Sequence, residues 1–143
     1  MNADRVLVDT WGWLALADDR EPKHRAVRAL VRALWQQAQA ALTTDYILDE
    51  TFTLVFRRLP FATAQRFVRT IEAAEQQGSL QVERISAERF ALAKKLRLRF
   101  RDKPLISFTD LTSMVVMQEL RMRRVVTADD HFRRVSLGFE LQP

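Results

Sequence analysis

The chain has 143 residues, of which 48% are hydrophobic and 29% charged, and its formal net charge is +5 at pH 7. This length fits one domain, residues 1–143, with a hydrophobic core of its own, and the composition excludes a disordered chain. Cysteine is absent, which excludes disulfides, thiolate zinc sites and a cysteine nucleophile. No apolar run in the sequence is long enough to span a bilayer.

The N-terminal residues lead directly into a strand-like run. They lack the basic region and the long apolar region of a signal peptide, so we expect a cytoplasmic protein. A basic surface attracts phosphate backbones in a salt-dependent way. The net positive charge therefore favours a polyanionic partner such as nucleic acid, with solubility alone as the plain alternative.

The first half of the chain alternates strand and helix patterns. Val27, Leu30, Val31 and Leu34 recur at helical spacing after Pro22, which suits the start of a helix. The elements expected in this half are a strand at residues 5–8, a helix at 23–39, a strand at 41–44, a helix at 45–58 capped by Asp45, and a helix from Pro60 to Gly78.

The second half repeats this alternation. Ser86 is a weak N-cap signal for a helix whose apolar face contains Leu92, Leu96 and Phe100, and Pro104 closes the basic loop behind it. The other elements expected are a strand at 79–85, a helix from Thr109 or Asp110 to Arg121, a strand at 124–127, a short turn at 131–134 and a strand at 138–141. Such alternation predicts an α/β fold with a mostly parallel sheet that is covered on both faces.

Four carboxylates occur where a globular protein normally avoids them. Asp9 and Asp129 each follow an apolar strand-like run, Glu50 interrupts the apolar stripe of a helix, and Asp110 opens a helix. An acid in an apolar setting is costly unless its charge is paired or bound to a metal. Because ligands of open α/β sheets bind beyond the carboxyl ends of the strands, the two strand-end acids predict one shared site.

Each acid also has a purely structural explanation. Asp9 could cap the next short helix, Glu50 could lie at a helix boundary and pair with an arginine, and Asp110 could complement a helix dipole. Asp129 could be a turn residue, and the adjacent Asp130 could cap the turn that follows. We prefer Asp129 for the site because it is closer to the end of the strand.

Taken together, the four acids predict a site for a divalent ion. Close carboxylates repel and raise one another's pKa values, and a cation relieves that repulsion. Mg²⁺ takes oxygen ligands and keeps several waters, which leaves room for phosphate oxygens, and such ions stabilise in-line displacement at phosphorus. A basic protein with this site is expected to hydrolyse a polyanion without a histidine or cysteine nucleophile.

Four segments in this order resemble the PIN-domain ribonucleases, and most of all the VapC-type toxins of type II toxin–antitoxin modules. They are residues 6–10 (VLVDT), 43–50 (TTDYILDE), 107–113 (SFTDLTS) and 127–132 (TADDHF), and the ending 137–141 (LGFEL) is similar to the closing strand of that family. The resemblance covers nearly the whole chain. It implies a three-layer α/β/α sandwich with a central, mostly parallel sheet.

The resemblance also implies an activity and partners. The activity is that of a Mg²⁺-dependent endoribonuclease, with Mn²⁺ as an alternative ion, acting on RNA phosphodiester bonds. The family's acidic residues, which hold the metal and carry catalysis, fall on Asp9, Glu50, Asp110 and Asp129. The family further implies a cognate antitoxin that blocks the site, and a homodimer.

Other residues near these segments carry open alternatives. Thr10 and Ser113 match hydroxyl residues that could hold a water or a carboxylate beside the acids. Trp11 and Trp13 stand where small or aliphatic residues are more usual in the family. They could reshape the mouth of the site, stack an RNA base, or pack in the core or at a subunit contact. His131 could act as a general base, or pack or hydrogen-bond within its turn.

Two groups of basic residues could contact an RNA backbone or simply face solvent. One group contains Lys94, Arg97, Arg99, Arg101 and Lys103. The other contains Arg121, Arg123, Arg124, Arg133 and Arg134. Charge removal at Arg133 and Arg134 is expected to weaken RNA binding and to flatten its salt dependence.

Three other functions fit the sequence less well. The main alternative is a catalytically silent PIN-like module that binds RNA or a protein, which divalent-ion-dependent turnover would distinguish. A receiver-type signalling domain needs a lysine late in the chain, but none follows Lys103. An acid-rich phosphatase needs two aspartates one residue apart after the first strand, but Asp9 is followed by Thr10 and Trp11.

Overall fold

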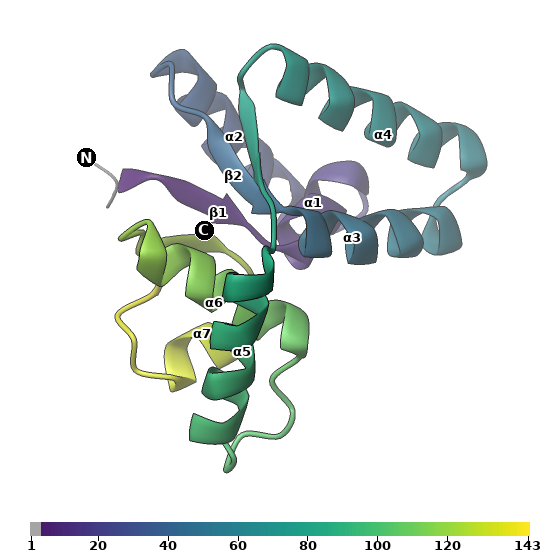
Figure 1. Ribbon diagram of the computed structural model, residues 1–143. Coiled ribbons are helices and arrows are strands. Elements are labelled where there is room, and N and C mark those ends of the chain that lie inside the picture. The colour runs from purple at the N-terminus through teal and green to yellow at the C-terminus, as the bar shows by residue number, and fades with distance from the viewer. Residues whose placement is uncertain (1–3) are drawn as a thin grey trace.

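The computed structural model describes residues 4–143, and its elements alternate between strands and helices as expected (Figure 1). In chain order they are β1 (Val6–Val8), α1 (Thr10–Ala17), α2 (His24–Gln36), β2 (Ala41–Thr44), α3 (Asp45–Arg58), α4 (Phe61–Gln76), β3 (Leu80–Glu83), α5 (Ala87–Arg99), α6 (Phe108–Glu119), β4 (Arg124–Val126), α7 (His131–Arg134) and β5 (Glu140–Gln142).

The strands form one parallel sheet in the order β3-β2-β1-β4-β5. At its centre Leu7 pairs with Leu42 on one side and Val8 pairs with Val126 on the other. The three residues of β1 are fully buried, as expected for a parallel strand with helices over both faces. The predicted fold class, an α/β/α sandwich around a parallel sheet, is therefore confirmed.

The direction of the crossovers divides the helices between the two faces. The chain moves outward from β1 through β2 to β3, then returns past β1 to β4 and β5. Because such crossovers are right-handed, the two directions place their helices on opposite faces. Accordingly, α1 contacts α2, α3 and α4, while α5 pairs with α6, and Figure 1 shows α5 and α6 together, away from α2 and α4.

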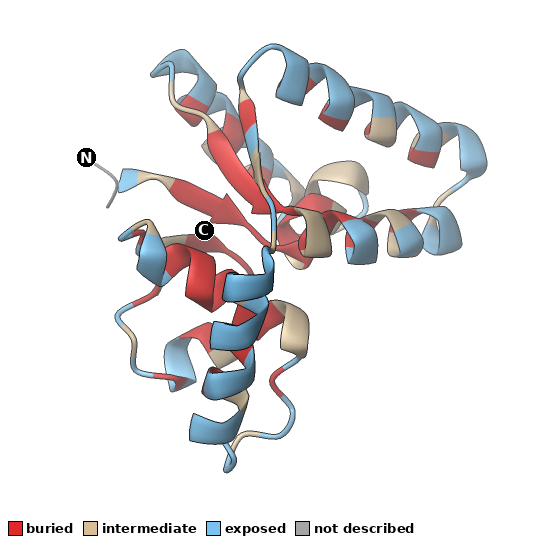
Figure 2. Ribbon diagram, viewed as in Figure 1, coloured by how far each residue is buried: buried red, intermediate tan, exposed pale blue. Residues whose placement is uncertain are grey.

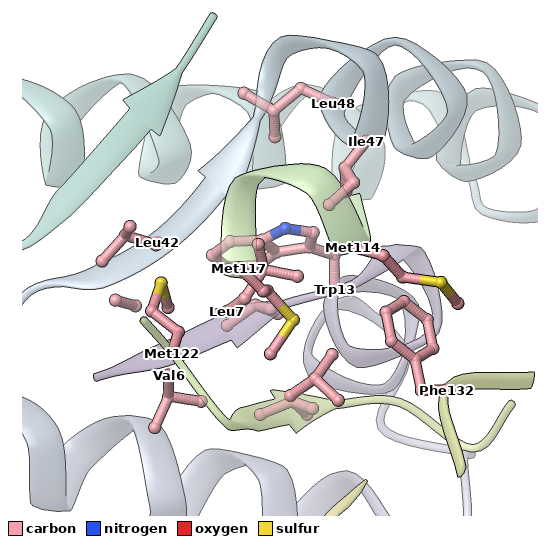
Figure 3. Packing of buried hydrophobic residues seen from close by; sticks show 14 of the residues in the cluster. Val6, Leu7, Trp13, Leu42, Ile47, Leu48, Met114, Met117, Met122 and Phe132 are labelled. Atoms are coloured by element: carbon pink, nitrogen blue, oxygen red, sulfur yellow. The ribbon is translucent and has the colours of Figure 1, made fainter. Parts of the chain in front are cut away.

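The core lies between the sheet and its two helical layers. Figure 2 shows β1 and β2 buried and the outer faces of α4 and α5 exposed. The helix α6 is buried on all sides, since every residue from Asp110 to Met117 is buried. Met114 and Met117 of α6 and Trp13 of α1 are among the buried side chains of this core (Figure 3). An acid in such a helix has little contact with water.

α1 packs closely against the strand ends, and one glycine makes this possible. A Cβ atom on Gly12 would lie 2.8 Å from Cγ1 of Val126 and 2.9 Å from both its carbonyl oxygen and Cγ1 of Val8. Real Cβ atoms essentially never approach so closely. Gly12 therefore lets the helix that follows Asp9 lie directly over the ends of β1 and β4.

Several helix boundaries differ from the predicted ones because of local capping. Thr44 rather than Asp45 is the N-cap of α3, and its hydroxyl accepts the amide of Ile47. Ser107 caps α6 by accepting the amide of Asp110, so this helix starts at Phe108, one residue before Thr109 and two before Asp110, the two predicted starts. These hydroxyls satisfy amides that the first turn of a helix leaves unpaired.

Two further boundaries differ from the predicted ones because the backbone turns near them. The helix predicted at 23–39 is shorter, α2 ending at Gln36 before Ala38 adopts a φ of 55°. The last strand begins at Glu140, two residues later than predicted, because Gly138 takes a left-handed φ of 82° in the turn before it. Glycine adopts this conformation without the steric cost that other residues incur.

Candidate active site

The candidate site lies where the crossover direction of the sheet reverses, between β1 and β4. Ligands of open α/β sheets bind outside the carboxyl ends of strands at such a switch point. Asp9 directly follows β1, and its amide donates to the carbonyl oxygen of Val126 at the end of β4 (3.1 Å). Asp129 follows β4 by three residues. The sheet therefore brings the two strand-end acids to one edge.

A cleft of about 310 Å³ opens at this edge, and all four predicted acids line it. They come from the β1–α1 junction, α3, α6 and the loop after β4. The residues that line the cleft are Asp9, Thr10, Trp11, Leu14, Glu50, Arg58, Leu105, Ser107, Asp110, Asp129 and His131. Segments separated by up to 120 residues in the sequence thus supply one concentrated negative surface.

Asp9 is the most constrained of the four acids, with only 5% of its surface exposed. Its Oδ2 accepts a hydrogen bond from Oγ1 of Thr127 (3.0 Å), whereas Oδ1 is buried and has no hydrogen-bond partner among residues 4–143. Burial, together with the charges of Glu50 and Asp129, raises the pKa of Asp9 to about 6 despite the hydrogen bond from Thr127. Its side chain makes no helix-capping hydrogen bond, which removes the structural explanation considered above.

Asp110 is buried in the first turn of α6, with 7% of its surface exposed. Burial raises its pKa to about 8, and the charges of Asp9, Asp129 and Glu50 add to this shift. Each of these causes penalises the ionised carboxylate. A cation in the cleft would remove much of that penalty.

Glu50 departs from its expected environment because it is exposed rather than buried. Successive residues of a helix are about 100° apart, and this turn places Glu50 to the side of the buried stripe of α3. The buried residues of that stripe are Ile47, Leu48, Thr51 and Val55. Its Oε2 accepts from Oγ1 of Thr10 (2.8 Å) rather than from an arginine. This bond holds the carboxylate at the mouth of the cleft.

The structure separates Asp129 from Asp130. Asp129 lines the cleft, and its Oδ1 accepts the amide of His131 (2.9 Å). Asp130 makes no cap hydrogen bond, contrary to the alternative considered above, and instead binds Arg133 and Arg134 at 3.1 Å each. Its carboxylate is thus already paired on the surface, outside the cleft.

His131, for which the sequence left open a role as a general base or within its turn, lines the cleft. Its Nδ1 lies 3.0 Å from Oδ1 of Asp129 and 3.5 Å from Oδ2 of Asp110. Among the described residues, this buried Nδ1 has no hydrogen bond of good geometry. The two distances therefore show that the ring lies close to both carboxylates, without a hydrogen bond to either. Ligand atoms of the three residues lie within 4.8 Å of one another.

The hydroxyl residues around the acids are only partly those expected. Thr10 binds Glu50, but the hydroxyl of Ser113 donates to the carbonyl oxygen of Thr109 and holds no carboxylate. Thr127, which was not singled out in the sequence, binds Asp9 instead. Its position at the end of β4, two residues before Asp129, is the signal that could have found it.

The two tryptophans have different environments. Trp13 is 3% exposed, donates its indole N–H to Oγ1 of Thr43 (3.0 Å), and packs edge-on against Phe67. Of the alternatives considered, the structure places it in the core. Trp11 is partly exposed and lines the cleft beside Asp9.

Several of the basic residues expected at an RNA surface have structural contacts. Arg97 donates to the carbonyl oxygens of Ile106, Phe100 and Lys103 and so holds the loop between α5 and α6. Arg124 donates to the carbonyl oxygen of Asp4. The cation that does line the cleft is Arg58, which lay outside both predicted groups.

A second, larger cavity of about 600 Å³ is separate from the acids. It is mostly apolar, lies between α1, α2 and α4, and is lined by residues that include Trp13, Val31 and Phe67. Because it lacks the four clustered carboxylates, we place the candidate chemistry in the smaller cleft. Within residues 4–143, no helix is both long and apolar enough to cross a membrane.

Two solved structures resemble the chain along nearly its full length. VapC20 of Mycobacterium tuberculosis, described as a toxin that cleaves the sarcin–ricin loop, is 25% identical, with a TM-score of 0.76 over 96% of this chain and 99% of that one. VapBC2 of Rickettsia felis, bound to a DNA fragment from its promoter, is 16% identical, with a TM-score of 0.73 over 96% and 98%. The second likeness bears on the fold alone.

Sequence comparisons give the family. A search among curated proteins found no match. The PIN domain family model matches residues 6–137, a span that includes all four acids, both strand ends and the residues of the cleft. On the strength of this match across almost the whole sequence, the chain belongs to the PIN domain family.

Proposed function

We propose that this protein is a Mg²⁺-dependent endoribonuclease that hydrolyses RNA phosphodiester bonds, with Mn²⁺ as an alternative ion. The observation that carries the proposal is the convergence of Asp9, Glu50, Asp110 and Asp129 on one cleft at the switch point of the sheet. Membership of the PIN family and the likeness to the VapC20 toxin support the same class of hydrolase.

The residues of the cleft fit a divalent ion. The buried Oδ1 of Asp9 has no hydrogen-bond partner in the described part of the chain, and burying such an oxygen is unfavourable unless something binds it. Burial and mutual repulsion also raise the pKa values of Asp9 and Asp110. Hard oxygen ligands of this kind suit Mg²⁺ or Mn²⁺.

In this proposal Asp9, Asp110 and Asp129 hold the ion directly. Glu50 holds it directly or through water, or positions the attacking water, because its carboxylate stands at the cleft mouth on the hydroxyl of Thr10. Thr127 keeps the Asp9 carboxylate oriented from the neighbouring strand end. The bound ion supplies Lewis acidity for in-line displacement at phosphorus.

RNA as the substrate, and toxicity, are proposals that go beyond the fold. The net charge of +5 favours a polyanion, and VapC20 is a toxin that cleaves the sarcin–ricin loop. We propose that this chain is likewise the toxin of a type II toxin–antitoxin pair, with a cognate antitoxin as its partner. The similarity in fold to VapBC2 of R. felis, which was solved bound to a promoter DNA fragment, supports the proposal of such a partner. We further propose a homodimer, following the family resemblance.

The direct test is incubation of the purified protein with structured RNAs in Mg²⁺, in Mn²⁺ and in EDTA. We expect cleavage with either ion and none in EDTA. Asp9→Asn should abolish cleavage while circular dichroism shows a folded protein. Asp130→Asn is the matched control, because Asp130 is an adjacent-loop carboxylate that binds Arg133 and Arg134 outside the cleft.

Two results would contradict the proposal. Full activity in Asp9→Asn would show that the cleft does not perform the chemistry. RNA binding without any divalent-ion-dependent turnover would instead favour a catalytically silent PIN-like module.

A further inference from the structure

Arg58 is the basic side chain of the acid-lined cleft. It is the last residue of α3, and no other arginine or lysine is among the described residues that line this cleft. Arg58 is exposed. A strand of RNA that reached the acids would therefore meet one guanidinium group on the wall of the cleft.

The position of Arg58 on α3 sets it apart from the acids. It follows Glu50 by eight residues, which is slightly more than two helical turns and about 12 Å along the helix axis. Arg58 therefore lies apart from Glu50, at the far end of α3. The largest causes that raise the pKa values of Asp9 and Asp110 are burial and the neighbouring carboxylates.

Arg58 also makes no ion pair within 4 Å among residues 4–143. A second, small cavity beside it is lined by Leu14, Leu59, Asp18 and Glu21. Asp18 is already bound by Arg20, with Nε 2.9 Å from Oδ1. The guanidinium is therefore available to a ligand.

A structural role as the cation at the C-terminal end of α3 does not single out Arg58. Cations in the last turn of a helix favour the helix dipole, but Arg57 occupies the same turn and serves that role equally. Arg57 is also exposed, and it does not line the cleft. What distinguishes Arg58 from its neighbour is the cleft itself.

We propose that Arg58 binds a backbone phosphate of the substrate RNA, away from the bond that is cut, and so fixes the register of the strand in the cleft. This inference rests on the proposed function. Arginine suits the task because its planar guanidinium binds phosphate oxygens in pairs. The acids cannot bind that phosphate themselves, because they would repel it.

The experiment measures binding of a fluorescent single-stranded RNA to the Asp9→Asn protein, which holds substrate without cutting it. Binding is measured over a series of KCl concentrations, alone and with Arg58→Ala, Arg58→Lys or Arg57→Ala added. For Arg58→Ala we expect about tenfold weaker binding, and a salt slope smaller by about 0.7, the loss of one phosphate contact on a single strand.

The companion variants separate a specific contact from general charge. Arg57→Ala removes the same charge one residue away and should change affinity less than about twofold. Arg58→Lys should keep the salt slope but recover only part of the affinity, because lysine lacks the paired geometry. In the active wild-type background, Arg58→Ala should also spread the cut over several positions.

Equal effects of Arg58→Ala and Arg57→Ala on affinity and slope would overturn the inference, as would a failure to bind RNA at all. Cleavage by the unmutated protein in Mg²⁺ is scored separately. If that cleavage occurs while Arg58→Ala behaves like Arg57→Ala, the nuclease proposal stands and only the role of Arg58 fails.

Discussion

The hydroxyl of Thr127 donates a hydrogen bond of 3.0 Å to Oδ2 of Asp9, joining the ends of two neighbouring parallel strands at the switch point of the sheet. Both residues are buried, and the same Thr127 hydroxyl also accepts the amide of Asp129 (3.0 Å). One side chain thus orients the two strand-end acids together.

Thr127→Val should therefore impair cleavage while keeping the shape of the core. Loss of the hydroxyl removes a hydrogen bond that lowers the pKa of Asp9, so the pH at which activity rises should shift upward. Residues that orient metal ligands typically contribute about 10- to 100-fold to affinity or activity. The measurement is the pH profile of RNA cleavage in Mg²⁺, beside Thr70→Val, an exposed threonine on α4. An unchanged profile in Thr127→Val would show that the bond has no functional role.

Without a divalent ion, the acid cluster should make the folded protein less stable as the pH rises. Folding raises the pKa of Asp9 to about 6 and that of Asp110 to about 8, from an ordinary value of 3.8. Between these limits the folded state binds more protons than the unfolded state. The contribution of the two groups is therefore largest near pH 4, falls through the window up to pH 8, and then levels off.

Asp110→Asn tests this stability argument directly. In EDTA at pH 8, it should raise the free energy of unfolding by at least about 1.4 kcal/mol, the equivalent of one pKa unit, because it removes a charge that burial disfavours. Urea denaturation at several pH values, with Asp130→Asn as the surface control, measures the effect. In Mg²⁺ the order should reverse, since ion binding stabilises only the protein with intact ligands. A less stable Asp110→Asn in EDTA would contradict the account.

Because α1 approaches the sheet so closely, we predict that Gly12→Ala lowers the stability of the fold. Its new Cβ would meet the side chains of Val8 and Val126, and also the carbonyl oxygen of Val126, which cannot move without disturbing the strand. Overpacking of this kind costs about 1–3 kcal/mol. Because Asp9 directly precedes α1, a displaced helix should lower activity as well. Unchanged stability in urea denaturation would mean that the helix yields easily.

The sequence was sufficient for features that depend on local pattern and chain order. Alternating strand and helix patterns predicted the parallel sheet, and acids after apolar runs predicted carboxylates at its edge. The sequence did not reveal features that depend on how helices and loops pack against one another in the fold. Glu50 is exposed because the buried stripe of α3 is centred on other residues, and no periodicity shows that Arg58 lines the cleft or that Asp130 binds two arginines.

Substitutions of Trp11 and Trp13 should have different effects, the first on RNA binding and the second on the stability of the fold. Trp13→Ala removes a buried ring and its hydrogen bond to Thr43, and should cost about 3–5 kcal/mol of stability. Trp11→Ala removes a partly exposed ring beside Asp9 in the cleft. If that ring stacks on a base, its loss should weaken RNA binding by about 1–3 kcal/mol.

The two variants are compared by urea denaturation and by RNA binding in the Asp9→Asn background. Trp11→Phe is the rescue variant, because a phenylalanine ring can also stack and should restore most of the affinity lost in Trp11→Ala. If Trp11→Ala destabilises the fold as much as Trp13→Ala and leaves binding intact, Trp11 is a packing residue. Loss of binding without loss of stability would place Trp11 on the substrate path that leads from the acids toward Arg58.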